Sequence, residues 1–427
     1  MRLLTATALA LCMGWVPVAA AQGARATDPP FSGLPARLDP AEAVALALAR
    51  SPRTAAAAAR LDAAAGAAQQ AAALPNPELS VEMENFRGSG PYRGFDSVET
   101  TYSLSQTIEL GGKRGARKDA AAAARDASRQ DLALARQDLA RDVRQAFTAA
   151  VAATAERRLA AERVRLAQET ERSIQARVDA GREAPPQAGR AGIDRRQAEI
   201  ALARAGRDEA AARQSLATLL NLPAIDAALE DGWFMRTGHP APPPVPAGDP
   251  GRSPEIGRLE AQVRQGHAEL AQEKGRVVPD LTVSAGFRRF RDSGDNAFLV
   301  GVSVPIPLFD QNRGAIARAR AEMVAAEADL ATARMEQERN RALARARFDS
   351  AREQADALRD QIVPTARQAL DNVNEGYRQG KFGYLDVLDA QRTLFDVERD
   401  LIEALRGFHD ARAELERLGA AAPDGEE

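Results

Sequence analysis

The sequence predicts a mainly α-helical, exported protein that carries four β-strands able to enter a membrane. Three observations favour this class. Alanine-rich segments without proline run for up to about 68 residues, roughly 100 Å as a helix, which is too long for one globular core. Four segments of about ten residues alternate apolar and polar side chains, as membrane-facing or half-buried strands do. The first 21 residues have the pattern of a secretory signal peptide.

The predicted signal peptide, residues 1–21, begins with Arg2 and continues with an apolar run at 3–18 and the small residues at 19–21. The run is too short to span a membrane, and its flanks are not those of an anchor. The single cysteine, Cys12, lies inside the run and follows a leucine, which argues against a lipidation site. The mature chain would contain no cysteine, so disulfides, zinc–thiolate sites and thiol nucleophiles are excluded.

Composition excludes a second group of functions. Charged residues make up 27% of the chain, yet the net charge is only −3, so no basic surface for nucleic acid is expected. Aromatic residues make up 4%, and alanine, the strongest helix former, recurs in runs. Outside the signal peptide no apolar run approaches the ~20 residues of a membrane helix. Any entry into a membrane must therefore be made by strands.

The chain repeats itself at an offset of about 200 residues. Each repeat reads as helix, strand, strand, long helix, turn, helix. The first repeat, 22–221, is predicted to contain a helix at 40–73, strands at about 78–86 and 100–110, a long helix at 113–180 and a helix at 187–221. A proline-rich linker follows at 222–253, with an extended stretch at 239–250. The second repeat, 254–418, is predicted to contain a helix at 254–274, strands at about 280–290 and 297–308, a long helix at 313–379 kinked by Pro364, and a helix at 384–418, before a tail at 419–427.

The strand pattern leaves two interpretations open. In 78–86 the apolar side chains are Leu79, Val81 and Met83, with serine and glutamate between them. A soluble sandwich would give the same alternation as a membrane sheet. If the strands are in a membrane, an even number returns the chain to its starting side, so all helices lie on one side. Four strands cannot close a barrel, and open edges are not tolerated in lipid, so the protein would have to oligomerise.

Four stretches carry a resemblance to a known family: NPELSVEMENF (76–86), ETTYSLSQTIELGGKRGAR (99–117), VGVSVPIPLFDQNRGAIARA (300–319) and GYRQGKFGYLDVLDAQRTLF (376–395). With their order along the chain, they resemble the TolC superfamily of outer-membrane efflux channels, and most closely its cobalt-zinc-cadmium heavy-metal branch. The resemblance implies a homotrimer in the outer membrane with a large periplasmic portion. It implies a 12-stranded β-barrel continued by a periplasmic barrel of coiled-coil helices, which contacts a periplasmic adaptor and an inner-membrane resistance-nodulation-division pump. It implies no cofactor, no nucleic acid and no enzyme activity.

The resemblance also implies where the pore narrows. Tyr377, Gly380 and Gly383 match the turn and gate at the periplasmic tip, and Asp386 and Asp389 match acidic residues that ring the constriction. The two acids are three residues apart and therefore share a helix face. Three copies would give two rings of negative charge. The alternative is an ordinary solvated helix face.

Two departures from the family pattern concern the gate. Phe382 stands where some relatives have a basic latch residue, beside Lys381. In the first repeat, residues 185–187 are Pro-Pro-Gln where relatives can carry a polar, acidic pair, so this tip is predicted to lack the acid. The latch must therefore differ from that of those relatives.

No other motif indicates catalysis or resident metal. The LGGKRG stretch at 110–115 lacks phosphate-loop spacing. The histidines, His239, His267 and His409, are scattered, and His409 is predicted to be exposed. The sequence thus predicts a passive exit duct, most closely one for divalent heavy-metal cations. A duct for drugs or for type I protein secretion is the alternative within this class, and a soluble periplasmic coiled-coil or adaptor protein is the alternative outside it.

Overall fold

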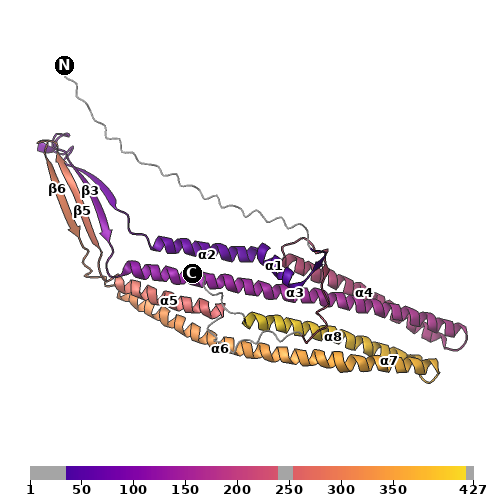
Figure 1. The fold of residues 1–427 in the computed structure, drawn as a ribbon. Helices are drawn as coiled ribbons and strands as arrows, with labels where there is room; N and C mark the ends of the chain where they lie inside the picture. The colour runs from indigo at the N-terminus through magenta and orange to yellow at the C-terminus, as the bar shows by residue number, and fades with distance from the viewer. Residues whose placement is uncertain (1–34, 239–252, 420–427) are drawn as a thin grey trace, which may run out of the picture.

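The computed structural model describes residues 35–238 and 253–419, which form one elongated body (Figure 1). A β-sheet lies at one end, and helices run from it to two hairpin turns at the opposite end. The predicted signal peptide, the stretch at 239–250 with His239, and residues 420–427 of the tail lie outside the described residues.

The element order follows the two repeats. The first contains β1 (Arg37–Leu38), α1 (Pro40–Arg50), α2 (Pro52–Ala71), β2 (Glu78–Glu84), β3 (Glu99–Ile108), α3 (Lys113–Asp179) and α4 (Pro185–Leu219). After β4 (Ala228–Leu229), the second contains α5 (Pro254–Gly275), β5 (Leu281–Phe290), β6 (Asn296–Ser303), α6 (Arg313–Ala357), α7 (Val363–Arg378) and α8 (Tyr384–Gly419). None of the described helices has a stretch long and apolar enough to cross a membrane.

Two of the predicted helices are interrupted, in each case at a proline. The helix predicted at 40–73 is two helices, because Ser51 is extended (ψ 125°) ahead of Pro52, as a residue before proline prefers. The Ser51 hydroxyl accepts a hydrogen bond from the Arg53 N–H at 3.2 Å and so caps α2. The long helix of the second repeat is interrupted by a π-helical turn, Leu358–Ile362, just before Pro364. The extra residue in this turn accommodates a ring that has no N–H to donate.

The predicted linker is only partly a linker. Its first part, up to residue 238, folds back into the body, where β4 pairs in parallel with β1 and Phe234 is buried. His409, predicted to be exposed, is buried: its Nε2 lies 2.8 Å from the Phe234 carbonyl oxygen, and its ring packs edge-on to Trp233. The sequence could not reveal this because the partners lie about 175 residues away.

The largest apolar core lies midway along the body, where this folded segment crosses the helices. It combines side chains of α1, α3, α4, α6 and α8, including the fully buried Val143, Phe147, Leu216 and Leu405. Elsewhere many of the buried side chains between helices are alanines, whose small size allows close approach. The core therefore joins the helices of the two repeats midway along the body.

The four longer strands form one antiparallel sheet in the order β2-β3-β5-β6. The pairing of β3 with β5 joins the two repeats. Side chains in register form rows across the sheet, such as Leu79–Leu104–Ala285–Val300 and Val81–Tyr102–Phe287–Phe298. β2 and β6 each have one edge without a partner strand in the described chain.

The two faces of this sheet have opposite chemistry. The face that carries the rows above, here called the outward face, is apolar and exposed: Phe298 is 91% exposed and Val300 81%. The other face, here called the inward face, is polar, and Thr101 on it is only 8% exposed. There the Arg288 guanidinium bonds to Glu99 at 2.9 Å and to Glu84 at 3.1 Å. A water-soluble sheet would bury its apolar face, so this arrangement favours a membrane sheet over a sandwich.

The helices form two rows of four that repeat the order of the sheet. Near the sheet the row is α2-α3-α5-α6, and toward the hairpin turns it is α4-α3-α8-α7. In the sheet and in both rows, first-repeat elements (β2, α2, α4) form one edge and second-repeat elements (β6, α6, α7) form the other. The molecule is thus an open segment of wall with two different free edges.

Asp410 of α8 is a partly buried carboxyl whose protonation should affect the stability of the fold. Its Oδ1 is buried without a hydrogen-bond partner among the described residues, and burial raises the pKa of this carboxyl to about 6 from an ordinary 3.8. Arg406, at 3.8 Å, offsets only part of the shift. Because the folded state holds the proton more tightly, the free energy of unfolding falls as pH rises from about 4 to 6 and changes no further above it.

We therefore expect Asp410→Asn to raise the free energy of unfolding by about 1 kcal/mol at pH 7.5, after allowance for the partial exposure of the group. The gain should shrink toward zero at pH 3 or below, where the carboxyl is largely protonated in both the folded and the unfolded native chain. Denaturant unfolding of the detergent-extracted protein at the two pH values would measure it, with the exposed Asp371→Asn as the control. A pH-independent effect, or equal gains in both variants, would contradict this account.

Candidate functional site

The candidate site is the helical tip, formed by the turns 180–184 and 379–383 and the helix ends beside them (Figure 1). In the second turn Gly380 adopts a left-handed conformation (φ +77°), and the Lys381 N–H donates to the Gly376 carbonyl at 2.8 Å. Gly181 (φ +68°) does the same in the first turn. This is the Schellman ending, which favours glycine because a Cβ is strained at positive φ. The two hairpins are therefore built alike.

Phe382, the residue at the position of the family's basic latch, packs back onto its own hairpin. A Cβ added at Gly376 would lie 2.2 Å from the Phe382 ring, so the ring rests on bare backbone of α7. Its other side is exposed. The aromatic ring thus packs against the turn and, being uncharged, cannot form the ion pair that a basic residue could form at this position.

Asp386 and Asp389 lie on the first turns of α8, and both are exposed. The Asp386 Oδ2 accepts a hydrogen bond at 2.8 Å from the N–H of Gly383, the residue directly before α8. Asp386 therefore caps the helix, and its charge also suits the positive end of the helix dipole. Gly383, predicted to mark the turn, has this capping role, while Gly380 provides the reversal itself.

Tyr377 connects the two hairpin turns. Its hydroxyl donates to Glu183 Oε1 at 3.3 Å, and the Arg177 guanidinium lies 4.8 Å from the centre of its ring. Arg177 also pairs with Glu183 at 3.5 Å. Burial, more than the neighbouring charges, raises the pKa of Tyr377, so the hydroxyl remains a donor. Residues 185–187 carry no acid, but Glu183, two residues before Pro185, places a carboxylate in the first tip.

A small core beneath the turns holds the hairpins together. Tyr384 is buried against Ile174, Ala191 and Leu388, from three different helices. Burial is the main cause that raises the pKa of Tyr384 to about 12, and the Asp194 carboxylate adds to it. Sequence reasoning did not single out Tyr384, Arg177 or Glu183. The only local signal was their closeness to the two turn glycines.

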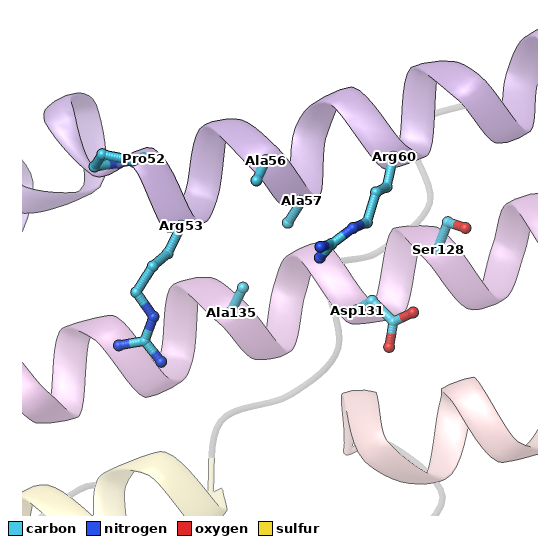
Figure 2. A pocket seen from close by; sticks show the side chains of 8 residues that line it. All are labelled: Pro52, Arg53, Ala56, Ala57, Arg60, Ser128, Asp131 and Ala135. Atoms are coloured by element: carbon cyan, nitrogen blue, oxygen red, sulfur yellow. The ribbon is translucent and has the colours of Figure 1, made fainter.

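The described residues contain no other arrangement suited to chemistry. A groove of about 690 Å³ runs between α2 and α3, where Arg53 and Arg60 reach from α2 across a floor of alanines (Figure 2). It is lined by Pro52, Arg53, Ala56, Ala57, Arg60, Ser128, Asp131 and Ala135. No group of three or more histidine, cysteine or acidic side chains in the described residues could hold a metal ion. The groove offers no nucleophile paired with a base.

The family model named "outer membrane efflux protein" matches residues 43–222 and again 251–420, once for each repeat. The chain belongs to the outer membrane efflux protein family. The resemblance to the TolC superfamily is thereby confirmed, and the protein is an outer-membrane efflux channel of that family.

Similar proteins and solved structures support the same family assignment. The chain is 31% identical to the cobalt-zinc-cadmium resistance protein CzcC of Cupriavidus metallidurans over 88% of each chain. It is 33% identical to the nickel and cobalt resistance protein CnrC of the same organism, over 75% of this chain and 73% of CnrC. The solved structure of CusC has the same fold, with a TM-score of 0.76 at 17% identity over 90% of this chain and 92% of CusC.

Proposed function

We propose that three copies of this chain form the outer-membrane exit duct of a tripartite pump that exports divalent heavy-metal cations. The observation that carries the proposal is a sheet with an exposed apolar outward face and two free edges. Exposure of such a large apolar face to water is unfavourable, which favours its contact with lipid. In lipid, the unpaired backbone groups of the two edges would be unsatisfied unless other copies of the chain pair with them.

Cyclic assembly resolves both problems. The β2 edge of one copy pairs with the β6 edge of the next, and three copies give 12 strands, within the range of known closed membrane barrels. The helix rows close in the same rotation, because their free edges lie on the same two sides. Exposed apolar side chains lie on edge helices, where such an interface needs them: Ile193 and Ile200 on α4, and Val324, Met335 and Leu343 on α6.

The closed wall would enclose a water-filled path from the helical tip to the strand loops. Inward hydroxyls and carboxylates of the sheet line one end. At the other end, Asp386 and Asp389 of three copies form the acidic rings of the constriction. The Tyr377–Glu183 contact holds the tips together in one of their gating states, and Gly380 permits the reversal there.

The remaining parts of the proposal rest on the family and its relatives. The relatives' names concern cobalt, zinc, cadmium and nickel, all divalent cations. The chain would be exported through its signal peptide, with the helices in the periplasm. It would act without a cofactor or catalysis of its own, against a periplasmic adaptor and an inner-membrane resistance-nodulation-division pump. The outward face disfavours the soluble coiled-coil alternative, while drugs or secreted protein remain rival cargoes.

Deletion of the gene tests the cargo. We expect the deletion strain to lose tolerance to cobalt, zinc, cadmium or nickel several-fold, with tolerance to drugs and detergents unchanged, and the full chain supplied in trans to restore it. Minimal inhibitory concentrations measure both arms. Unchanged metal tolerance together with drug sensitivity would favour a drug duct.

A further inference from the structure

The outward face of the sheet changes character toward the strand loops. An aromatic pair crosses it, with the rings of Tyr102 and Phe287 stacked 5.1 Å apart. The next outward position on β5 is Arg289, in register with Thr100. Arg291 follows β5 as the first residue of the turn, and its N–H donates to the Val98 carbonyl at 3.0 Å. Two arginines therefore follow the aromatic row at the loop end of the sheet, Arg289 on the outward face and Arg291 in the turn directly after β5.

These two arginines differ from Arg288, which directly precedes Arg289. Arg288 points to the inward face and is held by Glu84, Glu99 and Thr101. Arg289 and Arg291 are both exposed, and within the described residues neither forms an ion pair. The nearest acid in sequence, Asp292, uses Oδ1 to accept a bond from the Ser293 N–H at 2.7 Å. The fold thus neutralises Arg288 and leaves Arg289 and Arg291 without an ion pair among the described residues.

The rest of the outward face shows no comparable pair at its other end. There the outward positions carry no charge and most are apolar, for example Leu79, Ile108 and Leu281. At the loop end, Arg87 lies 5.5 Å from the ring of Phe95, which stacks on Phe86. Cations and aromatic rings are thus concentrated at the loop end of the apolar band.

We propose that Arg289 and Arg291 bind the phosphate groups of lipid headgroups in the membrane leaflet on the loop side. This rests on the proposed function, which places the outward face in lipid. An aromatic row lies at the membrane–water boundary in barrels, and residues one outward position further along reach the headgroups, about 7 Å away. The planar guanidinium forks bind phosphate oxygens two at a time. Phosphorylated glycolipid of the outer leaflet is the partner that this geometry favours.

Native mass spectrometry of the detergent-extracted full chain tests the proposal. The oligomer is titrated with lipid A that carries its phosphates, with the same lipid after their removal, and with inorganic phosphate. We expect phosphorylated lipid A to bind at least about tenfold more tightly than the dephosphorylated form, and the R289Q/R291Q variant to lose that preference. The R289K/R291K variant, which keeps charge without the fork, should lie between. The control is R320Q/R347Q, which removes the same charge from exposed, unpaired positions on α6.

Three results would overturn the inference: equal binding by R289Q/R291Q and wild type, an equal loss in the α6 control, or binding of inorganic phosphate as tight as that of lipid A. Channel conductance in planar bilayers separates this inference from the proposed function. If wild type and R289Q/R291Q both conduct but bind lipid A equally, only the lipid site is wrong. If wild type forms no channel, the proposed function fails.

Discussion

Replacing Val300 by arginine should abolish insertion of the protein into the outer membrane. Val300 lies in the middle of β6 on the outward face and is 81% exposed. An arginine on the lipid side of a membrane strand costs about 2–4 kcal/mol near the midplane, and a trimer would carry three. The variant should therefore be missing from the outer-membrane fraction, and refolding into lipid vesicles should fail. Membrane fractionation and vesicle refolding measure the two effects.

The neighbouring residue provides a matched control. Leu299 lies on the inward face of the same strand, opposite Gly286. Leu299→Arg adds the same charge at almost the same depth, but into the space that the proposed assembly fills with water. It should insert close to normally. Equal insertion of the two variants, or failure of Leu299→Arg alone, would contradict lipid contact by the outward face.

Changing Asp386 and Asp389 to asparagine should remove most of the cation preference of the channel. Both carboxylates are exposed at the start of α8, and the proposed trimer would place six of them around the narrowest part of the path. Rings of carboxylate attract cations and repel anions in a confined pore. The reversal potential across a salt gradient should fall toward zero, and single-channel conductance should change several-fold. Asparagine retains an oxygen that can accept the Gly383 N–H, so α8 should still form.

The D62N/D329N variant serves as the control for charge. Both residues are exposed on helices remote from the tip, and no described contact involves them. The control should keep the wild-type reversal potential. If D386N/D389N also keeps it, the two acids belong to an ordinary solvated helix face and the constriction lies elsewhere.

Much of the fold followed from local signals. Alternation in the four strands indicated which side chains share a face, because side chains alternate with a fixed period of two. Gly380 marked a reversal, because few other residues tolerate positive φ. Pro364 indicated an interruption, although its form as a π turn depended on packing. The break at Ser51 could also have been read from the proline after it.

The tip was predicted less completely. The positions of Tyr377 and Gly380 followed from resemblance, but the partner of Tyr377 did not. Glu183 lies 194 residues away in sequence, and only the folding of two hairpins against each other brings the pair together. The roles of Asp386 and Asp389 in a pore remain predictions. The structure adds that Asp386 also caps its helix.

The sequence by itself determined the repeat, the long helices, the strands with their apolar and polar sides, and the family. These properties are encoded over a few residues or by a period along the chain. Only the tertiary structure decided that residues up to 238 fold into the core, that His409 is buried, and that Glu183 meets Tyr377. It also decided that both helix rows and the sheet leave their free edges on the same two sides. Such facts depend on contacts between residues far apart in sequence, whose closeness no local pattern records.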